Sequence, residues 1–204
     1  MPSCGRPKGT SANVNRDPRS LDPLAFPLHQ YVMLDTETTG LDPRTGARLL
    51  EIGMARVEND HVAEVFDTLV NPMQPIPPVI TELTGLTDSD ARTAPDLTGA
   101  MRRFEQWLEP DDIIIAHNAP FDMMFLDLAI REVTGNKKRF LPHLYVDTLR
   151  MSRLLHPERV HHSVVALIRA YGIGESEKHR ALSDALQEEQ VYRALRGEAF
   201  GVYR

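Results

Sequence analysis

The chain has 204 residues, of which 42% are apolar and 25% are charged, the composition of an ordinary globular domain. The formal charge of −6 argues against a protein coated with positive charge for non-specific nucleic-acid binding, but it does not exclude an enzyme whose bound cations neutralise phosphate. The single cysteine, Cys4, excludes an internal disulfide framework and a cysteine-rich zinc site. The sequence has no apolar run long enough to cross a membrane and no signal-peptide core, so we expect a cytoplasmic protein with no membrane contact.

The first 30 residues differ in composition from the rest of the chain. They are rich in Pro, Ser, Asn and Arg and have little apolar periodicity, so we expect a flexible N-terminal leader or a partner-docking arm over residues 1–30. Residues 31–204 are expected to form one folded domain.

The predicted elements of this domain alternate after an opening hairpin. The apolar run at residues 31–34 ends in a carboxylate and predicts a buried strand. Two β-rich segments follow at residues 49–57 and 62–70, with Glu58-Asn59-Asp60-His61 as the hairpin turn between them. Further strands are predicted at residues 113–116 and 144–146, and helices at residues 96–108, 121–133, 148–155, 163–171 and 181–195. This order predicts an α/β layer structure with carboxylates at strand ends and helix starts.

The first acidic cluster is Asp35-Thr36-Glu37-Thr38-Thr39-Gly40. Residues two apart on an extended backbone face the same side, so Asp35 and Glu37 lie together and repel each other unless a cation sits between them. The alternative is a strand end whose Asp and Thr side chains satisfy turn amides, and this hexapeptide alone does not decide between the two.

Two more clusters follow along the chain. In His117-Asn118-Ala119-Pro120-Phe121-Asp122, the aspartate falls in the first turn of a helix, where the helix dipole alone also favours an acidic residue. In His179-Arg180-Ala181-Leu182-Ser183-Asp184, His179 precedes the last helix and Asp184 lies in its early turns. Such a histidine is placed to take a proton from a bound water, and its alternative role is to cap the helix.

Together, in this order and spacing, the three clusters resemble the DEDDh exonucleases, with Asp-x-Glu, Asn-x-x-x-Asp and His-x-x-x-x-Asp motifs. The resemblance spans residues 31–195 and looks closest to the exonuclease domain of the epsilon (proofreading) subunit of bacterial DNA polymerase III. It implies a ribonuclease-H-like mixed β-sheet, with opening antiparallel strands and then parallel strands, flanked by helices. It also implies hydrolysis of terminal phosphodiester bonds in the 3′-to-5′ direction, with release of nucleoside 5′-monophosphates.

The resemblance further implies two divalent ions, Mg²⁺ or Mn²⁺. Asp35 would bridge both ions, Glu37 and Asp184 would complete the first site, and Asp122 would hold the second site partly through water. His179 would take the proton of the attacking water as the general base. Hard oxygen ligands and the single cysteine favour the same ions independently.

Weaker parts of the resemblance concern the nucleic acid itself. Phe121 is expected to stack on a terminal base, unless it belongs to the core. Contacts with sugar, base or phosphate are implied for Thr36, Leu83, Thr84 and Asn118. The expected partner is the 3′ end of a nucleic acid, with single-stranded DNA preferred.

The pathway and the exact substrate have several alternatives. The chain ends at Arg204, soon after the last motif, so we expect a free-standing exonuclease of repair or turnover rather than a proofreading subunit bound to a DNA polymerase. The first motif looks more like that of the DNA-directed members, and an RNA-trimming exonuclease is the alternative. A non-catalytic adaptor that binds strand ends is the rival from another class, but such a scaffold has no physical reason to keep four uncompensated carboxylates together.

Overall fold

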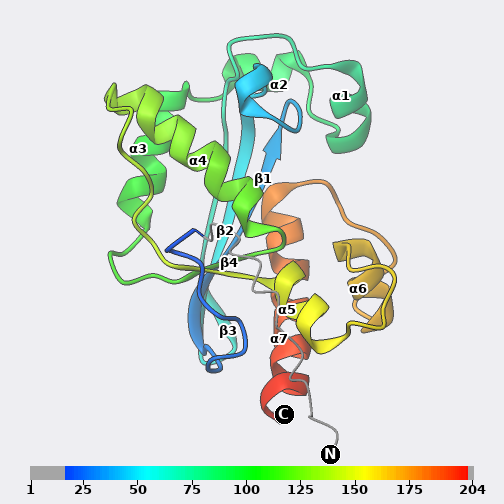
Figure 1. The fold of residues 1–204 in the computed structure, drawn as a ribbon. Helices are drawn as coiled ribbons and strands as arrows, with labels where there is room; N and C mark the ends of the chain where they lie inside the picture. Colours follow the sequence, from blue (N-terminus) through cyan, green and yellow to red (C-terminus); the bar gives the residue numbers. More distant parts are fainter. Residues whose placement is uncertain (1–16, 202–204) are drawn as a thin grey trace, which may run out of the picture.

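Residues 17–201 are described by the computed structural model and form a five-stranded mixed sheet with helices on both faces (Figure 1). The strands lie in the order β3-β2-β1-β4-β5. Their bounds are β1 Gln30–Thr38, β2 Leu49–Glu58, β3 His61–Leu69, β4 Ile114–Ala116 and β5 Tyr145–Asp147. The first three strands pair antiparallel, whereas β4 pairs parallel with both β1 and β5. The expected mixed α/β sheet is therefore confirmed.

The helices predicted from the apolar pattern are present, and each begins within two residues of its expected start. They are α3 Leu97–Trp107, α4 Ala119–Thr134, α5 Thr148–Leu155, α6 Val164–Ala170 and α7 Ala181–Phe200. Three short pieces were missed: the 3₁₀ turn η1 Pro43–Thr45, α1 Pro78–Thr84 and α2 Asp88–Thr93. They are too short to show periodicity and depend on local signals, such as the capping box between Thr87 and Asp90. Within the described part of the chain, no helix combines the length and apolar character needed to cross a membrane.

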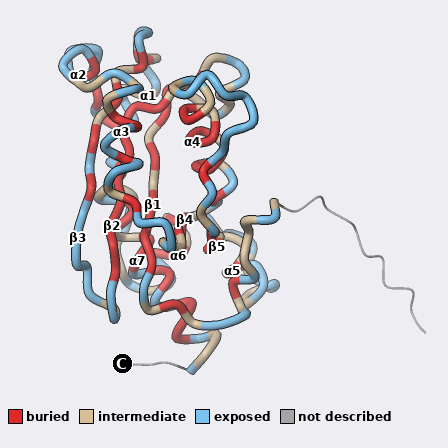
Figure 2. The backbone as a smooth tube through the Cα atoms, turned by 90° about the vertical axis from the view of Figure 1, so that its left-hand side faces the viewer, coloured by how far each residue is buried: buried red, intermediate tan, exposed pale blue. Residues whose placement is uncertain are grey.

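Alternate residues of β1 face two separate cores. Val32 and Leu34 pack in a cluster with α3 and α4, whereas Tyr31 and Met33 pack in a second cluster with α5, α6 and α7. Figure 2 shows that β1 and β2 are buried along most of their length and that the edge strand β3 is largely exposed. The odd-numbered series continues with Asp35, which therefore lies on the side of the sheet that α7 covers.

The hairpin between β2 and β3 has the predicted turn. Glu58 pairs with His61, and the two residues between them, Asn59 and Asp60, have φ angles of 50° and 68°. A two-residue turn with both φ angles positive matches the twist of the flanking strands, and Asn and Asp tolerate this conformation better than most residues.

Residues 17–30 do not form the flexible leader that we expected. Ser20 forms a parallel bridge with Tyr145, so this segment covers the β5 edge of the sheet. The guanidinium of Arg19 donates to both carboxylate oxygens of Asp127 on α4 and to the carbonyl of Leu141. The expected boundary at residue 31 is too late. Hydrogen bonds of Arg19 and the packing of Leu21, Leu24 and Leu28 against the second core hold this segment, although its apolar residues show no regular period. Residues 1–16, the rest of the expected leader, lie outside the described residues.

Candidate active site

Asp35 and Glu37 stand at the end of β1, on the side that α7 covers. They lie opposite Gly53 and Glu51 of β2 in the antiparallel register. Both side chains are partly exposed, and within residues 17–201 neither carboxylate accepts a hydrogen bond or joins an ion pair. The strand therefore presents two neighbouring carboxylates that the folded chain leaves uncompensated.

Gly53 lets α7 approach this side of the sheet closely. A Cβ atom at Gly53 would overlap the backbone of Ala181 and Leu182, at the start of α7. Because Gly53 lies directly opposite Asp35, this contact brings the first turn of α7, which carries Asp184, against the carboxyl end of β1. A glycine in the middle of a strand marks such a close approach of two backbones.

An ion pair fixes the same helix start to β2. Glu51, which is 1% exposed, accepts hydrogen bonds from the Arg180 guanidinium at 2.7 and 3.0 Å and from the backbone N–H of Ala181 at 3.1 Å. A paired carboxylate at a helix start satisfies an otherwise free N–H group and is favoured by the helix dipole. Glu51 and Arg180 therefore set where α7 begins.

The loop that carries His179 is shaped by Asp184. The two carboxylate oxygens of Asp184 accept the backbone N–H groups of Lys178, at 2.7 Å, and Arg180, at 3.2 Å. His179 lies between these two donors with a φ angle of 53°, which is unusual for a residue with a side chain. Possible ligand atoms of Glu37, His179 and Asp184 all lie within 4.8 Å of one another. The first and third sequence motifs thus meet here.

Asp122 reaches the site from the opposite side of the sheet. It lies in the first turn of α4, is 3% exposed and accepts a hydrogen bond of 2.7 Å from the hydroxyl of Thr36. Thr36 points to the side opposite Asp35, so successive residues of β1 contact α7 and α4. The second motif therefore joins the other two at the end of β1.

The turn between β4 and α4 is held by two carboxylates. The N–H of His117 donates to Oε2 of Glu188 on α7 at 3.1 Å, and the N–H of Asn118 donates to Oδ1 of Asp147 at 2.9 Å. Asn118 has a left-handed conformation with φ 64° and ψ 42°, which asparagine tolerates. These bonds fix the start of α4 and with it the position of Asp122.

Burial and the charges of neighbouring carboxylates raise the pKa values of Asp35, Glu37 and Asp122. The pKa of Asp35 lies well above its usual value because of burial and then because of the charges of Glu188 and Asp122. Burial and the charge of Asp184 raise the pKa of Glu37 to about 8. Burial raises the pKa of Asp122 to about 7, although the hydrogen bond from Thr36 acts in the other direction. The metal-free protein therefore cannot easily keep all of these groups ionised at neutral pH.

This donor set suits a divalent cation. The converging groups are carboxylates and one imidazole, with no thiolate, and a cation among them would replace repulsion by attraction. None of the ion pairs within residues 17–201 supplies a basic side chain to Asp35, Asp122 or Asp184. The residues present therefore fit the bound metal that the sequence motifs imply.

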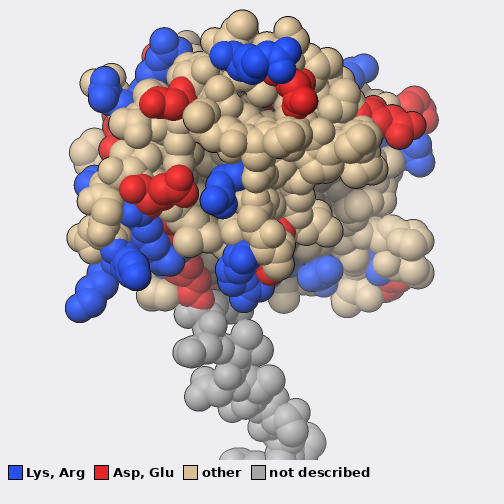
Figure 3. Space-filling view, turned by 90° about the horizontal axis from the view of Figure 1, so that it is seen from above, with Lys and Arg blue, Asp and Glu red and all other residues tan. Residues whose placement is uncertain are grey.

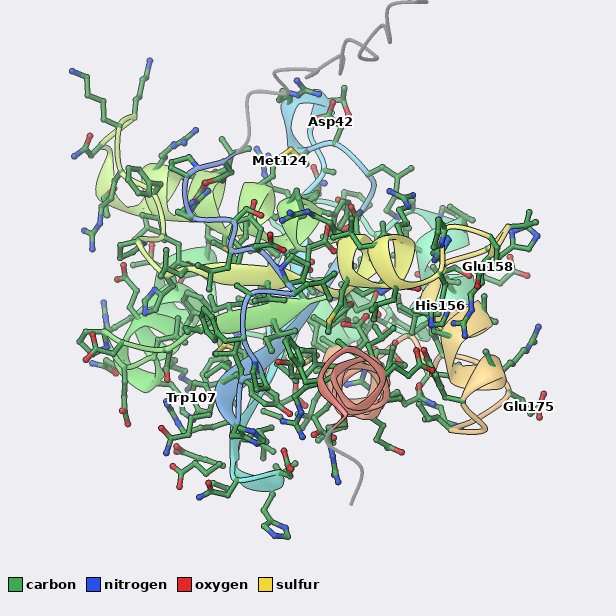
Figure 4. All side chains as sticks on the ribbon, turned by 60° about the horizontal axis from the view of Figure 1, so that its bottom comes forward. Asp42, Trp107, Met124, His156, Glu158 and Glu175 are labelled. Atoms are coloured by element: carbon green, nitrogen blue, oxygen red, sulfur yellow. The ribbon has the colours of Figure 1, made fainter. Side chains whose placement is uncertain are left out.

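A cavity of about 580 Å³ opens beside the carboxylates. Asp35, His117 and Glu188 line it together with residues from α5 and from the segment leading to α6, including Arg153 and His161. Figure 4 shows the α5 and α6 side of the molecule, marked by His156, Glu158 and Glu175, well away from Trp107 of α3. The cavity gives Asp35 its opening to solvent.

The surface charge does not form a uniformly positive platform. Figure 3 looks onto the end of the molecule near α1 and α2, where Lys and Arg side chains are interspersed with Asp and Glu. With a formal charge of −6 for the whole chain, bound cations would have to supply much of the attraction for phosphate.

Three of the residues expected to contact nucleic acid have exposed surface. Leu83 is 49% exposed, Asn118 is exposed, and Phe121 is half-buried with its ring centroid 5.0 Å from that of Phe125. Phe121 also packs against the α3 and α4 core, so a structural role in the core and stacking on a terminal base are both compatible with its position. Their contacts with nucleic acid stay predictions.

The two threonines of that set are buried. The hydroxyl of Thr36 is engaged with Asp122, and the hydroxyl of Thr84 donates to the carbonyl of Ile80 and accepts the N–H of Leu86. Thr36 therefore supports Asp122, whereas Thr84 supports the end of α1, and a direct contact of either side chain with substrate stays a prediction.

Several residues that hold the site together were missed in the sequence. They are Glu51, Gly53, Asp147, Arg180 and Glu188. Glu188 had a usable signal, since it lies four residues after Asp184 and hence on the same face of α7. The others depend on strand register or on contacts between distant elements, for which the local sequence gives no pattern.

Comparisons with known proteins show which proteins the chain resembles. The family model described as Exonuclease (RNase_T) matches residues 32–192. Over 154 residues the chain is 36% identical to a DNA polymerase III PolC-type protein of Bacillus subtilis (strain 168), covering 76% of this chain and 10% of that protein. Over 179 residues it is 37% identical to a DNA polymerase III subunit epsilon-like protein of Rhodobacter capsulatus, covering 86% of this chain and 24% of that protein. The chain thus spans a minor part of these relatives.

Solved structures share the fold. Exonuclease X in complex with 5′ overhanging duplex DNA superposes with a TM-score of 0.65 at 22% identity, covering 85% of this chain and 94% of that chain. The nuclease domain of 3′hExo, a DEDDh family member bound to rAMP, gives a TM-score of 0.70 at 13% identity, covering 83% of this chain and 91% of that chain. At these identities the likeness shows the fold.

Gly53→Ala should destabilise the protein by about 3 kcal/mol, because the added Cβ meets the rigid backbone of α7. Gly174→Ala is the matched control, since its Cβ would meet only the flexible end of Gln187, at 3.3 Å. Urea denaturation of both variants measures the difference. Equal free energies of unfolding for the two variants would contradict the close approach of α7 to β2.

The metal-free protein should lose stability as the pH rises. A carboxyl group whose pKa is raised on folding adds stability that is fully present below its unfolded pKa and is lost as the pH rises through its folded pKa. For Asp122 and Glu37 that loss extends from their ordinary pKa values of 3.8 and 4.5 up to pKa values of about 7 and about 8 in the folded protein. In a chelator, the urea midpoint should therefore be higher near about pH 5 than near about pH 8.

Asp122→Asn should flatten this pH dependence, because it removes one of the groups responsible. Saturating Mn²⁺ should flatten it as well, by favouring the ionised carboxylates. A metal-free midpoint that stays constant or rises over the same pH range would show that burial and mutual repulsion do not raise the pKa values of these carboxyl groups.

Proposed function

The chain belongs to the exonuclease (RNase_T) family, and from that premise we propose that it removes nucleoside 5′-monophosphates from the 3′ ends of DNA. The observation that supports the proposal most directly is the convergence of Asp35, Glu37, Asp122 and Asp184 at the end of β1, where none of the four forms an ion pair with a lysine or arginine among the described residues. A cluster of this kind is unfavourable for the fold alone and favourable once cations and a phosphodiester are bound.

In this proposal the same four carboxylates hold two divalent ions, Mg²⁺ or Mn²⁺. The all-oxygen carboxylate set favours these ions over those that prefer sulfur ligands. Bound cations would stabilise the negative charge on the entering and leaving oxygens and make water easier to deprotonate. The remaining tasks, orientation of the strand end and transfer of the proton, belong to side chains of the protein.

His179 is the proposed general base. It lies between Lys178 and Arg180, whose backbone N–H groups are both bound by Asp184, so the imidazole is carried on a segment fixed to a proposed cation ligand. The φ angle of 53° at His179 is sparsely populated for residues with side chains, and the two bonds to Asp184 offset its strain. From this position His179 would accept the proton of the attacking water.

Leu83, Asn118 and Phe121 are the proposed contacts with the terminal nucleotide, because all three expose apolar or polar surface and Asn118 and Phe121 belong to the second motif. Thr36 and Thr84 would act through the neighbours to which their hydroxyls are bonded. Aromatic stacking on a base tolerates any sequence, as a stepwise nuclease requires.

DNA is the proposed substrate because relatives over most of the chain are named for DNA polymerase III. The same names favour a second candidate, a proofreading role beside a polymerase. A cytoplasmic location and single-stranded 3′ ends as the partner are further parts of this proposal. An RNA-trimming role remains a candidate, since the neighbour 3′hExo was solved with rAMP bound.

The test uses single-stranded DNA and RNA oligomers of matched sequence, labelled at the 5′ end. With Mg²⁺ or Mn²⁺ the wild-type protein should produce a ladder in single-nucleotide steps, faster on DNA, and chelator should abolish it. Asp35→Asn should lower kcat by roughly a thousandfold, because it removes a charge that binds the cations without changing the shape of the side chain.

Asp111→Asn is the control, since Asp111 is exposed and lies at the other end of β1. Its rate should equal that of the wild type. Absence of a ladder with every cation would overturn the proposal and favour the non-catalytic adaptor. An unchanged rate in Asp35→Asn would instead overturn the role of the carboxylates in cleavage.

A further inference from the structure

Glu188 is a fifth carboxylate at the candidate active site. It lies one helical turn after Asp184 on the same face of α7, is 4% exposed and lines the 580 Å³ cavity together with Asp35. Among the charged neighbours of Asp35, Glu188 has the largest effect on the raised pKa of the Asp35 carboxyl group. Glu188 therefore faces the other carboxylates rather than solvent.

The folded chain does not compensate the charge of Glu188. Its Oε2 atom accepts the N–H of His117, and within residues 17–201 its other oxygen accepts no hydrogen bond and the carboxylate joins no ion pair. The next residue, Glu189, is also 4% exposed, but it accepts a hydrogen bond of 3.0 Å from Tyr31 and lies 3.8 Å from the Arg193 guanidinium. Two adjacent and equally buried glutamates thus differ in whether the protein supplies their partners.

The single hydrogen bond of Glu188 holds the turn between β4 and α4. His117 is the first residue after β4, and the turn that it opens leads directly into α4, with Asp122 in the first helical turn. The hydrogen bond from His117 to Glu188 therefore connects α7, which carries Asp184, to the turn that positions Asp122. In the described structure these two aspartates come from helices on opposite sides of the sheet.

We propose that Glu188 is a positioning residue of the cation site: one of its oxygens holds the β4–α4 turn, and its free oxygen adds negative charge beside Asp35. The hydrogen bond keeps Asp122 at a fixed distance from Asp184. The charge strengthens the binding of divalent cations. This inference rests on the proposed function for its cation site, but it concerns a residue outside the three sequence motifs.

Two substitutions separate the hydrogen bond from the charge. Glu188→Gln keeps an acceptor for the His117 N–H and removes the charge, whereas Glu188→Ala removes both. Both variants should bind Mn²⁺ about tenfold more weakly than the wild type, measured by calorimetry without nucleic acid. At saturating Mn²⁺, Glu188→Ala should also have a kcat about tenfold below that of Glu188→Gln, because only the alanine variant frees the turn.

Glu189→Gln is the matched control, since it changes an adjacent, equally buried glutamate whose partners lie away from the cavity. Its Mn²⁺ affinity and kcat should match those of the wild type. Urea denaturation in chelator establishes that each variant is folded, and Glu188→Gln should be at least as stable as the wild type because it removes a buried, repelling charge.

Wild-type Mn²⁺ affinity in Glu188→Gln would overturn the role of the charge, and equal kcat values for the glutamine and alanine variants would overturn the role of the hydrogen bond. The calorimetric comparison does not need nuclease activity. If the wild-type protein binds Mn²⁺ but cleaves no oligomer, the proposed function fails while the role of Glu188 in cation binding is still measured.

Discussion

Repulsion between carboxylates at the end of β1 is the constraint on which the rest of the site depends. Asp35 is placed there by β1, Asp122 by α4 and Asp184 by α7, and the described chain supplies no basic side chain between them. Such an arrangement lowers the stability of the metal-free fold and raises the affinity for cations by the same interaction. Cores on both faces of the sheet provide the stability that allows it.

The elements around the cluster are held by contacts that leave little freedom. Gly53 admits the backbone of α7 against β2, and Glu51 with Arg180 fixes where that helix begins. Farther along α7, Glu188 binds the N–H group of His117 in the turn before α4, and Asp147 at the end of β5 binds the N–H group of Asn118. Like charges stay together only because several elements fix their positions, which is the preorganisation that a catalytic cation site needs.

Residue spacing and apolar periodicity predicted the elements that form from nearby residues. The spacing of Asp35 and Glu37 placed both on one side of β1, and the apolar stripes located the long helices. Short α1 and α2 carry too few residues to show a period. The cross-strand position of Gly53 requires the register of β1 and β2, which no single segment of sequence contains.

The most direct test of the cation site is a crystal structure with Mn²⁺, measured at a wavelength where manganese scatters anomalously. Anomalous difference peaks should lie within about 2.6 Å of carboxylate oxygens of Asp35, Glu37 and Asp184, the upper limit for hard divalent cations bound by oxygen ligands, and Asp122 should hold the second ion directly or through water. If the carboxylates stay together but no manganese peak lies among them, even at the highest Mn²⁺ concentration that the crystals tolerate, the claim that they form a cation site would be contradicted.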